Sequence, residues 1–320
     1  MSRKIWLITA AILVAVGLVT ITVAMTLMDW DFSKLGNSSR ETNEYEIVEE
    51  FKSISINSST AKIQFIASDE EKCRVVCEEW DNLKYEVSVK DGVLTINFRD
   101  ERKWHEMIGF NFGKSEVSVY LPKGEYGNLF IESSTGDINV PDGYSFQAID
   151  VTMSTGDLYF ASSASESAEF KASTGDIKIE NAAFGSLYVS RSTGKTTIKN
   201  VETAGDIKLR ATTGDSLLSD VKCENLFSEA DTGDLTLDSV IASKRFDIER
   251  STGDVKFDAC DADGISVETD TGSVTGTLLT EKIFITETDT GHVELPDFRS
   301  GGKCEIETDT GDIKIQILKN

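Results

Sequence analysis

The pentapeptide ETDTG occurs three times near the end of the chain, at residues 268–272, 287–291 and 307–311. Asp-Thr-Gly is also the active-site tripeptide of aspartic proteases, which need two catalytic aspartates, one from each of two lobes. Here the three pentapeptides follow one another at an almost constant short spacing, and a fourth Asp-Thr-Gly stands at residues 231–233. Four copies arranged in this way are typical of a structural repeat rather than of a protease dyad.

The repeat extends far beyond these copies. A Thr-Gly pair recurs with the same spacing, and the residue seven positions before each glycine is always apolar. Positions two and four after the glycine are mainly Ile, Leu or Val, and the positions between them are polar. This alternation on both sides of the pair predicts two short strands in each repeat. The glycines are Gly136, Gly156, Gly175, Gly194, Gly214, Gly233, Gly253, Gly272, Gly291 and Gly311.

One repeat of this length cannot bury a hydrophobic face, whereas stacked coils share a core and pair with each other about 4.8 Å apart. We therefore expect an all-β fold over residues 126–320, a parallel β-solenoid of 19–20-residue coils. The Thr-Gly pair should form a corner between sheets, because glycine adopts positive φ at little cost. The threonine should face inward, the polar residue after the glycine should accept hydrogen bonds from turn amides, and Cys304 should lie in the core.

Residues 51–125 are expected to form irregular N-terminal coils and a cap. The segment 51–68 follows the same plan, with Thr60-Ala61-Lys62 where later coils have Thr-Gly-Asp. The segment 85–98 is typical of two strands joined by a turn at Asp91-Gly92. Residues 101–115 break the pattern, and we expect them to form a loop or part of the cap.

The N-terminal segment indicates a membrane span. Residues 5–28 carry no charge, and as a helix they would extend over about 36 Å, enough to cross the roughly 30 Å hydrocarbon core of a bilayer. Two basic residues precede this run and two aspartates follow it, which predicts a cytoplasmic N-terminus at residues 1–4 and an external remainder. Residues 29–50 are expected to be a polar linker. The alternative is a cleaved signal peptide, with Thr22-Val23-Ala24 as its candidate cleavage site.

Composition limits the classes of function. The net charge of −23 argues against nucleic acid as a partner, because a phosphate backbone would be repelled. Five cysteines without a repeated spacing are expected to be buried free thiols, since Cys73 and Cys77 would lie about 13 Å apart on a straight strand. There are two histidines and no G-x-S-x-G, H-E-x-x-H or C-x-x-C motif. We therefore expect that the protein is not an enzyme and binds no cofactor.

Carboxylates gather on one predicted ladder in the C-terminal half. At positions four and two before the glycine, their parity points outward, and stacking brings like charges close together. One interpretation is a solvated face that keeps a strand-rich rod from associating. The other is a cation-binding face for a hard ion such as Ca²⁺, which prefers carboxylate oxygens. The candidate residues are Glu268, Asp270, Glu287, Asp289, Glu307 and Asp309.

Three segments carry a resemblance to a known group: "SSTGDINV" at 133–140, "ASTGDIKI" at 172–179 and "RSTGDVKF" at 250–257. Together with "DGVLTI" at 91–96 and "VSVYLP" at 117–122, they make residues 51–320 similar to the bacterial "putative adhesin" domains of unknown function. The resemblance implies a right-handed parallel β-solenoid, often beyond a membrane segment. It implies adhesion without naming a ligand, links some relatives to envelope-stress responses, and carries over no catalytic residues.

These observations predict a single-pass membrane protein with a large extracytoplasmic domain. We expect a non-catalytic binding, adhesion or scaffolding module at the cell envelope, whose ligand is an envelope polymer or a protein. One alternative is an accessory component of an envelope-stress sensing system, which would need a partner in the membrane. Another is a carbohydrate-active enzyme, which would need a groove that gathers carboxylates from several coils.

Overall fold

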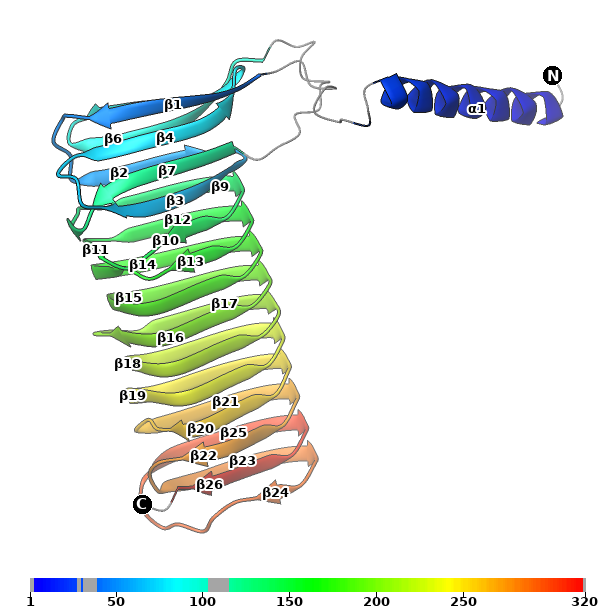
Figure 1. The fold of residues 1–320 in the computed structure, drawn as a ribbon. Helices are drawn as coiled ribbons and strands as arrows, with labels where there is room; N and C mark the ends of the chain where they lie inside the picture. Colours follow the sequence, from blue (N-terminus) through cyan, green and yellow to red (C-terminus); the bar gives the residue numbers. More distant parts are fainter. Residues whose placement is uncertain (1–2, 28–29, 31–38, 103–114, 319–320) are drawn as a thin grey trace.

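The computed structural model describes residues 3–27, 30, 39–102 and 115–318 (Figure 1). The loop expected at 101–115 lies almost wholly outside these residues. The chain begins with one helix, α1 (Arg3–Leu27). Within it, Ile5–Leu27 is apolar, with a mean hydropathy of 2.6, and most of its side chains are exposed. This helix is long and apolar enough to cross a membrane. A signal sequence can have the same length and hydropathy.

The remaining described strands, in residues 40–102 and 115–317, form a β-solenoid of about 10 turns, hereafter the rod (Figure 1). Its strands form two long ladders. Ladder A contains the strands that precede the Thr-Gly corners, and ladder B contains the strands that follow them. Apart from the first pairings at the N-terminal end, neighbouring strands are parallel, as expected for stacked coils.

Long strands turn a corner and contribute to both ladders. In spatial order, ladder A comprises β5 (Leu83–Lys90), β6 (Val93–Asp100), β2 (Ser53–Ser58), β9 (Leu129–Thr135), β12 (Ile149–Thr155), β14 (Ser163–Thr174), β15 (Ile177–Thr193), β17 (Ile207–Thr213), β18 (Ser216–Thr232), β19 (Leu235–Thr252), β21 (Gly264–Thr271), β25 (Gly302–Thr310) and β23 (Lys282–Thr290).

Ladder B follows the same axis. It comprises β1 (Arg40–Ile47), β4 (Cys73–Trp80), β7 (Ser115–Pro122), β3 (Ala61–Ser68), β10 (Ile138–Val140), β13 (Leu158–Phe160), β15, β16 (Thr196–Thr203), β18, β19, β20 (Val255–Cys260), β22 (Val274–Leu278), β26 (Ile313–Ile317) and β24 (Val293–Glu294). The short strands β8 (Gly124–Glu125) and β11 (Tyr144–Phe146) pair beside them.

The Thr-Gly pairs form corners, as predicted. Gly253 has φ +149°, and a Cβ atom there would overlap the carbonyl oxygen of Gly233 in the preceding coil. A side chain at this position would therefore collide with backbone as well as adopt an unfavourable conformation. The threonine that was expected to face inward is instead exposed. In most coils the last residue directed into the core stands three positions before the glycine, and the chain turns after it.

A second corner was missed by the sequence analysis. Six positions after the glycine, non-glycine residues adopt positive φ in five successive coils: Asn181, Asn200, Asp220, Ser239 and Ala259, with φ between 50° and 56°. The Asn200 side-chain amide donates to the side-chain oxygen of Asn181 at 2.8 Å, which links neighbouring corners. A third short paired segment follows, such as Ala182–Phe184 in register with Val201–Thr203. Coils of this kind therefore hold three strand segments rather than two.

The aspartate after the glycine binds between coils. The Asp157 carboxylate accepts a hydrogen bond from the backbone N–H of Asp176 at 2.9 Å, and Asp234 accepts from Asp254 in the same way at 2.9 Å. The predicted acceptor role is thus correct, but the amide belongs to the next coil. Most buried side chains along the rod are apolar, and Cys304 is fully buried as predicted.

The linker predicted at 29–50 is wrong over part of its length. Residues 40–47 form β1, which pairs antiparallel with β4 from Arg40↔Trp80 to Ile47↔Cys73. This segment is polar, so its sequence does not suggest burial. It forms a strand because the first coil would otherwise leave the edge of β4 unpaired, and alternate β1 side chains, ending at Ile47, turn inward.

The last two coils are not stacked in chain order (Figure 1). β21 pairs with β25, and β25 pairs with β23, so the C-terminal coil lies between the coil of β21–β22 and the coil of β23–β24. We call residues 302–317 the inserted coil. The regular repeat predicted to 320 is therefore correct in its period and wrong in its stacking order.

A buried ion pair spans the inserted coil. The Lys282 ammonium, 3% exposed, lies 2.6 Å from the Asp261 carboxylate and also donates to the Thr280 hydroxyl. Gly302 pairs with Lys282 in the ladder, and a Cβ atom on Gly302 would overlap the Asp263 carbonyl oxygen. The contact thus ties the coil of β23–β24, which is the outermost coil at this end of the rod, to the connection between β20 and β21 on the other side of the inserted coil.

We predict that Gly253→Val destabilises the rod by about 3 kcal/mol or more, because it adds backbone strain and a collision with the preceding coil. Thermal unfolding followed by circular dichroism measures the effect. Gly264→Ala is the matched control, because a Cβ atom at Gly264 meets nothing closer than 4.0 Å. Equal melting temperatures for Gly253→Val and the unmodified chain would contradict this account of the corner.

Candidate functional site

A pocket of about 730 Å³ opens at the N-terminal end of the rod. It lies where four connections meet: β1 to β2, β3 to β4, β5 to β6, and β7 to β8. We call it the cap pocket. It is lined by Ile47, Val48, Glu49, Glu50, Phe51, Lys52, Ser53, Glu71, Lys72, Cys73, Asp91, Gly92, Val93, Leu121, Pro122 and Tyr126.

The floor of the cap pocket is apolar. Ile47, Cys73 and Leu121 are buried there and continue the core of the rod. Phe51 and Tyr126 are half-buried, with nearly parallel rings whose centroids lie 6.3 Å apart. Burial raises the pKa of Cys73 to about 12, so its thiol stays protonated at neutral pH. The same cause raises the pKa of Tyr126 to about 12.

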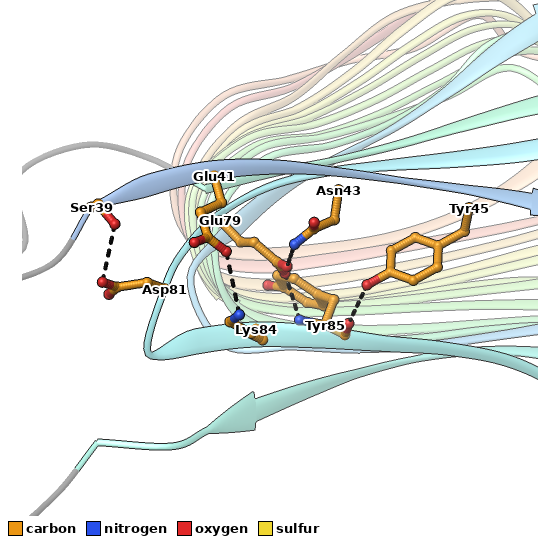
Figure 2. Close-up of polar contacts among 8 residues, drawn as sticks. All are labelled: Ser39, Glu41, Asn43, Tyr45, Glu79, Asp81, Lys84 and Tyr85. Carbon is orange, nitrogen blue, oxygen red and sulfur yellow. Dashed lines mark hydrogen bonds and ion pairs between the residues drawn. The ribbon is translucent and has the colours of Figure 1, made fainter.

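A polar network fastens β1 to the cap (Figure 2). The Glu79 carboxylate is 1% exposed and accepts two hydrogen bonds, from the Asn43 amide and from the backbone N–H of Tyr85, both at 2.6 Å. The Tyr45 hydroxyl donates to the Tyr85 carbonyl at 3.2 Å, and Lys84 approaches Glu41 at 3.3 Å. These contacts join β1 on ladder B to β5 on ladder A.

The network is structural rather than catalytic in its geometry. Its buried carboxylate is fully engaged by groups that hold β1, β4 and β5 together. The Tyr85 hydroxyl lies 2.8 Å from the Ser58 hydroxyl, and burial raises the pKa of Tyr85 to about 12. A phenol with so high a pKa stays protonated and can donate a hydrogen bond, but it is a poor base at neutral pH.

The six carboxylates predicted as a cation face are all exposed on the C-terminal half of ladder A. The structure brings them together in a different order from that predicted. Glu268 lies beside Glu307, and Glu307 beside Glu287, because the inserted coil intervenes. Glu268 and Glu287 therefore cannot share an ion directly. Within the described residues, no group of three His, Cys, Asp or Glu side chains is arranged to hold a metal.

A smaller hollow of about 170 Å³ lies at the start of this face. Carboxylates from three coils surround it, and the buried Arg250 is one of its lining residues. The lining carboxylates are those of Glu229, Asp231, Glu249, Glu268 and Asp270.

Two buried arginines were missed by the sequence analysis. Arg191 donates to the carbonyls of Thr213, Gly214 and Asp215 at 2.6–2.9 Å, in the coil that follows its own. In its coil Lys195 replaces the corner aspartate, so the guanidinium joins two corners where no carboxylate can.

Arg250 donates to the Ser228 hydroxyl at 2.7 Å, and burial lowers its pKa to about 10. The detectable signal for both residues was an arginine at an inward position, three before the glycine. At that position the other coils have Ser, Met, Ala or Thr.

The five cysteines are free and buried, as predicted. Burial raises the pKa of each thiol; for Cys304 the value is about 12 and for Cys260 about 11. His292 is exposed at the corner between β23 and β24, where its backbone N–H donates to the Asp312 carboxylate. His105 lies outside the described residues.

A rod of stacked parallel coils, with a pocket at one end and a carboxylate-rich face near the other, defines a β-solenoid whose accessible surfaces are its outer faces and its cap. The model of the Toastrack DUF4097 family matches residues 51–238 and 184–320, so it covers most of the chain. The chain belongs to the Toastrack family.

Several solved structures are similar to this chain at low identity. A "putative adhesin" from Parabacteroides distasonis is 12% identical, with a TM-score of 0.44 over 87% of this chain and 98% of that one. A "putative adhesin" from Bacteroides fragilis is 16% identical, with a TM-score of 0.37 over 87% and 97%. A "putative lipid binding protein" from Parabacteroides distasonis is 14% identical, with a TM-score of 0.37 over 88% and 98%. A search of curated proteins finds no match.

We predict that Glu268→Gln, Glu287→Gln and Glu307→Gln together raise the melting temperature in calcium-free buffer. Folding places these like charges on adjacent strands, about 4.8 Å apart, and amides remove their repulsion. A fall in melting temperature for the triple variant would contradict the repulsion.

Calcium separates the two interpretations of this face. If the face binds the ion, Ca²⁺ will raise the melting temperature of the unmodified chain more than NaCl does at equal ionic strength, and the triple variant will lose that excess. Equal effects of the two salts on the unmodified chain would contradict ion binding and support the interpretation as a solvated face.

Proposed function

We propose that this chain is a membrane-anchored, extracytoplasmic module that binds or scaffolds at the cell envelope without catalysis. The observation that carries the proposal is the filled rod that follows an apolar helix. Apolar side chains occupy the interior from Ile54 to Ile315, so ligands have access to the outer faces and to the cap pocket.

An orientation with the rod outside agrees with the charges around the helix. Arg3 and Lys4 lie before the apolar run, and Asp29 and Asp31 follow it. Basic residues are retained on the cytoplasmic side, so the rod would extend from the outer face of the membrane. An accessory role in envelope-stress sensing would use the same anchored rod, with a membrane partner to pass the signal inward.

The hollow lined by five carboxylates favours one other candidate, a carbohydrate-active enzyme. Glycoside hydrolysis uses a pair of carboxylates, one of which acts as an acid. Here all five carboxylates are exposed to solvent, so none has the apolar surroundings that a catalytic acid needs. Binding therefore explains this surface more simply than catalysis does.

The orientation can be tested with a membrane-impermeant maleimide on intact cells. All five native thiols are buried, so the unmodified chain is the blank. We predict that Ser251→Cys, at an exposed position on the rod, is labelled in intact cells. Ser2→Cys should be labelled only after the cells are permeabilised.

The reverse pattern would contradict the orientation. A chain in which Ser2→Cys is never labelled, even after lysis, would mean that the N-terminal segment had been cleaved.

A matched variant exchanges the flanking charges, with Arg3→Glu, Lys4→Glu, Asp29→Lys and Asp31→Lys. If these charges determine orientation, the exchange should reduce labelling at Ser251→Cys in intact cells.

A further inference from the structure

We propose that the cap pocket binds a peptide segment of a partner protein that carries an apolar side chain next to a lysine or arginine. This inference rests on the proposed role as a binding module and names the chemistry of its ligand. Four features of the pocket support it: its volume, its floor, its main chain and the charge of its rim.

The volume and the floor fit one or two large apolar side chains. A pocket of about 730 Å³ falls within the roughly 300–1,000 Å³ of typical ligand sites. The Tyr126 hydroxyl donates to the Pro122 carbonyl at 2.6 Å, so its ring offers the pocket mainly carbon atoms. The pocket also opens directly onto buried Ile47 and Leu121. An apolar side chain entering here would extend the core of the rod.

The main chain on one rim is free to pair with a peptide. Residues 48–51 connect β1 to β2 and form no backbone hydrogen bond within the described part of the chain. Hydrogen bonding resumes at Lys52, whose N–H donates to the Gly92 carbonyl at 2.9 Å. Val48 is 65% exposed beside these groups. A peptide can satisfy free N–H and C=O groups of this kind by running alongside them.

The charge of the rim selects a cationic segment over an anionic one. Four carboxylates face two lysines around the opening, and the chain as a whole has a net charge of −23. A fatty acid or a phosphate-bearing ligand would bring a negative charge to this rim and be repelled. A basic peptide would be attracted. The rim groups are Glu49, Glu50, Glu71 and Asp91, with Lys52 and Lys72.

The experiment uses the full chain in phosphatidylcholine nanodiscs with two photoreactive peptides, and with a photoreactive fatty acid as a third probe that should label the pocket less than the lysine peptide does. Each peptide carries benzoylphenylalanine as its apolar side chain, flanked by two lysines in one and by two glutamates in the other. After irradiation, mass spectrometry locates the cross-links. We expect the lysine peptide to label residues 47–53 and 121–126, and the glutamate peptide to label them far less.

Variants separate local charge from total charge. Glu49→Lys with Glu50→Lys should lower labelling by the lysine peptide about tenfold. Glu132→Lys with Glu202→Lys changes the net charge equally at exposed positions elsewhere on the rod, and should leave labelling almost unchanged. Circular dichroism checks that each variant remains folded.

Three results would overturn the proposal: equal labelling by both peptides, cross-links spread along ladder A, or stronger pocket labelling by a photoreactive fatty acid. Each of them would leave the membrane orientation and the binding role intact, because those rest on thiol labelling and on the filled rod. A reversed thiol-labelling pattern would instead contradict the proposed function, because the rod would then lie in the cytoplasm, away from any envelope partner.

Discussion

The close approach of backbone to backbone at the Thr-Gly corners is the constraint on which the rest of the rod depends. At each such corner, a carbonyl oxygen of one coil occupies the space that a side chain on the next coil would need. A Cβ atom on Gly175, for example, would overlap the Gly156 oxygen. Because one corner fits directly on another, the ladders keep one register, and the aspartate beside the corner reaches the amide of the next coil. The nearly constant period of the repeat follows from this fit.

A rod built in this way has two ends, and each leaves strand edges that need protection. At the N-terminal end, antiparallel strands replace the parallel coils, and the Glu79 network joins the two ladders (Figure 2). At the C-terminal end, the last segment of the chain is enclosed between two coils, and Lys282 holds the outer coil to Asp261. The outer coil remains partly exposed, with Ile283 and Ile285 at its surface. The cap pocket results from the same N-terminal arrangement, since it forms where four connections enclose an opening to the core.

The sequence predicted the parts of this structure that repeat. The Thr-Gly pairs and the apolar positions around them were sufficient to predict the corners, the core residues and the parallel coils, because the same pattern recurs in every repeat. Prediction from residue type failed at positions where the same conformation is adopted by different residue types. Asn181 and Ala259 both adopt positive φ at the second corner, yet alanine gives no indication of it. β1 is too polar to suggest a strand, and its pairing is decided by the exposed edge of β4. The inserted coil has the same repeat pattern as its neighbours, so no residue type distinguishes its place. The carboxylates of the C-terminal half were found by their parity, whereas the cap pocket was not found, because it joins residues from distant segments.

The order of the last coils provides the most direct test of this account. In the structure Ile265 lies beside Cys304 in ladder A, so their Cα atoms are about 4.8 Å apart, within the range that a disulfide can bridge. Stacking in chain order would place Phe284 between them and double that distance. We predict that Ile265→Cys forms a disulfide with the native Cys304 under mild oxidation, as measured by mass spectrometry of peptides from the folded chain. Phe284→Cys should also link to Cys304, since those residues are neighbours in either order, and serves as the control for reactivity. A bond between Ile265→Cys and Phe284→Cys in a chain that carries both changes with Cys304→Ala, together with no bond from Ile265→Cys to Cys304, would contradict the inserted coil.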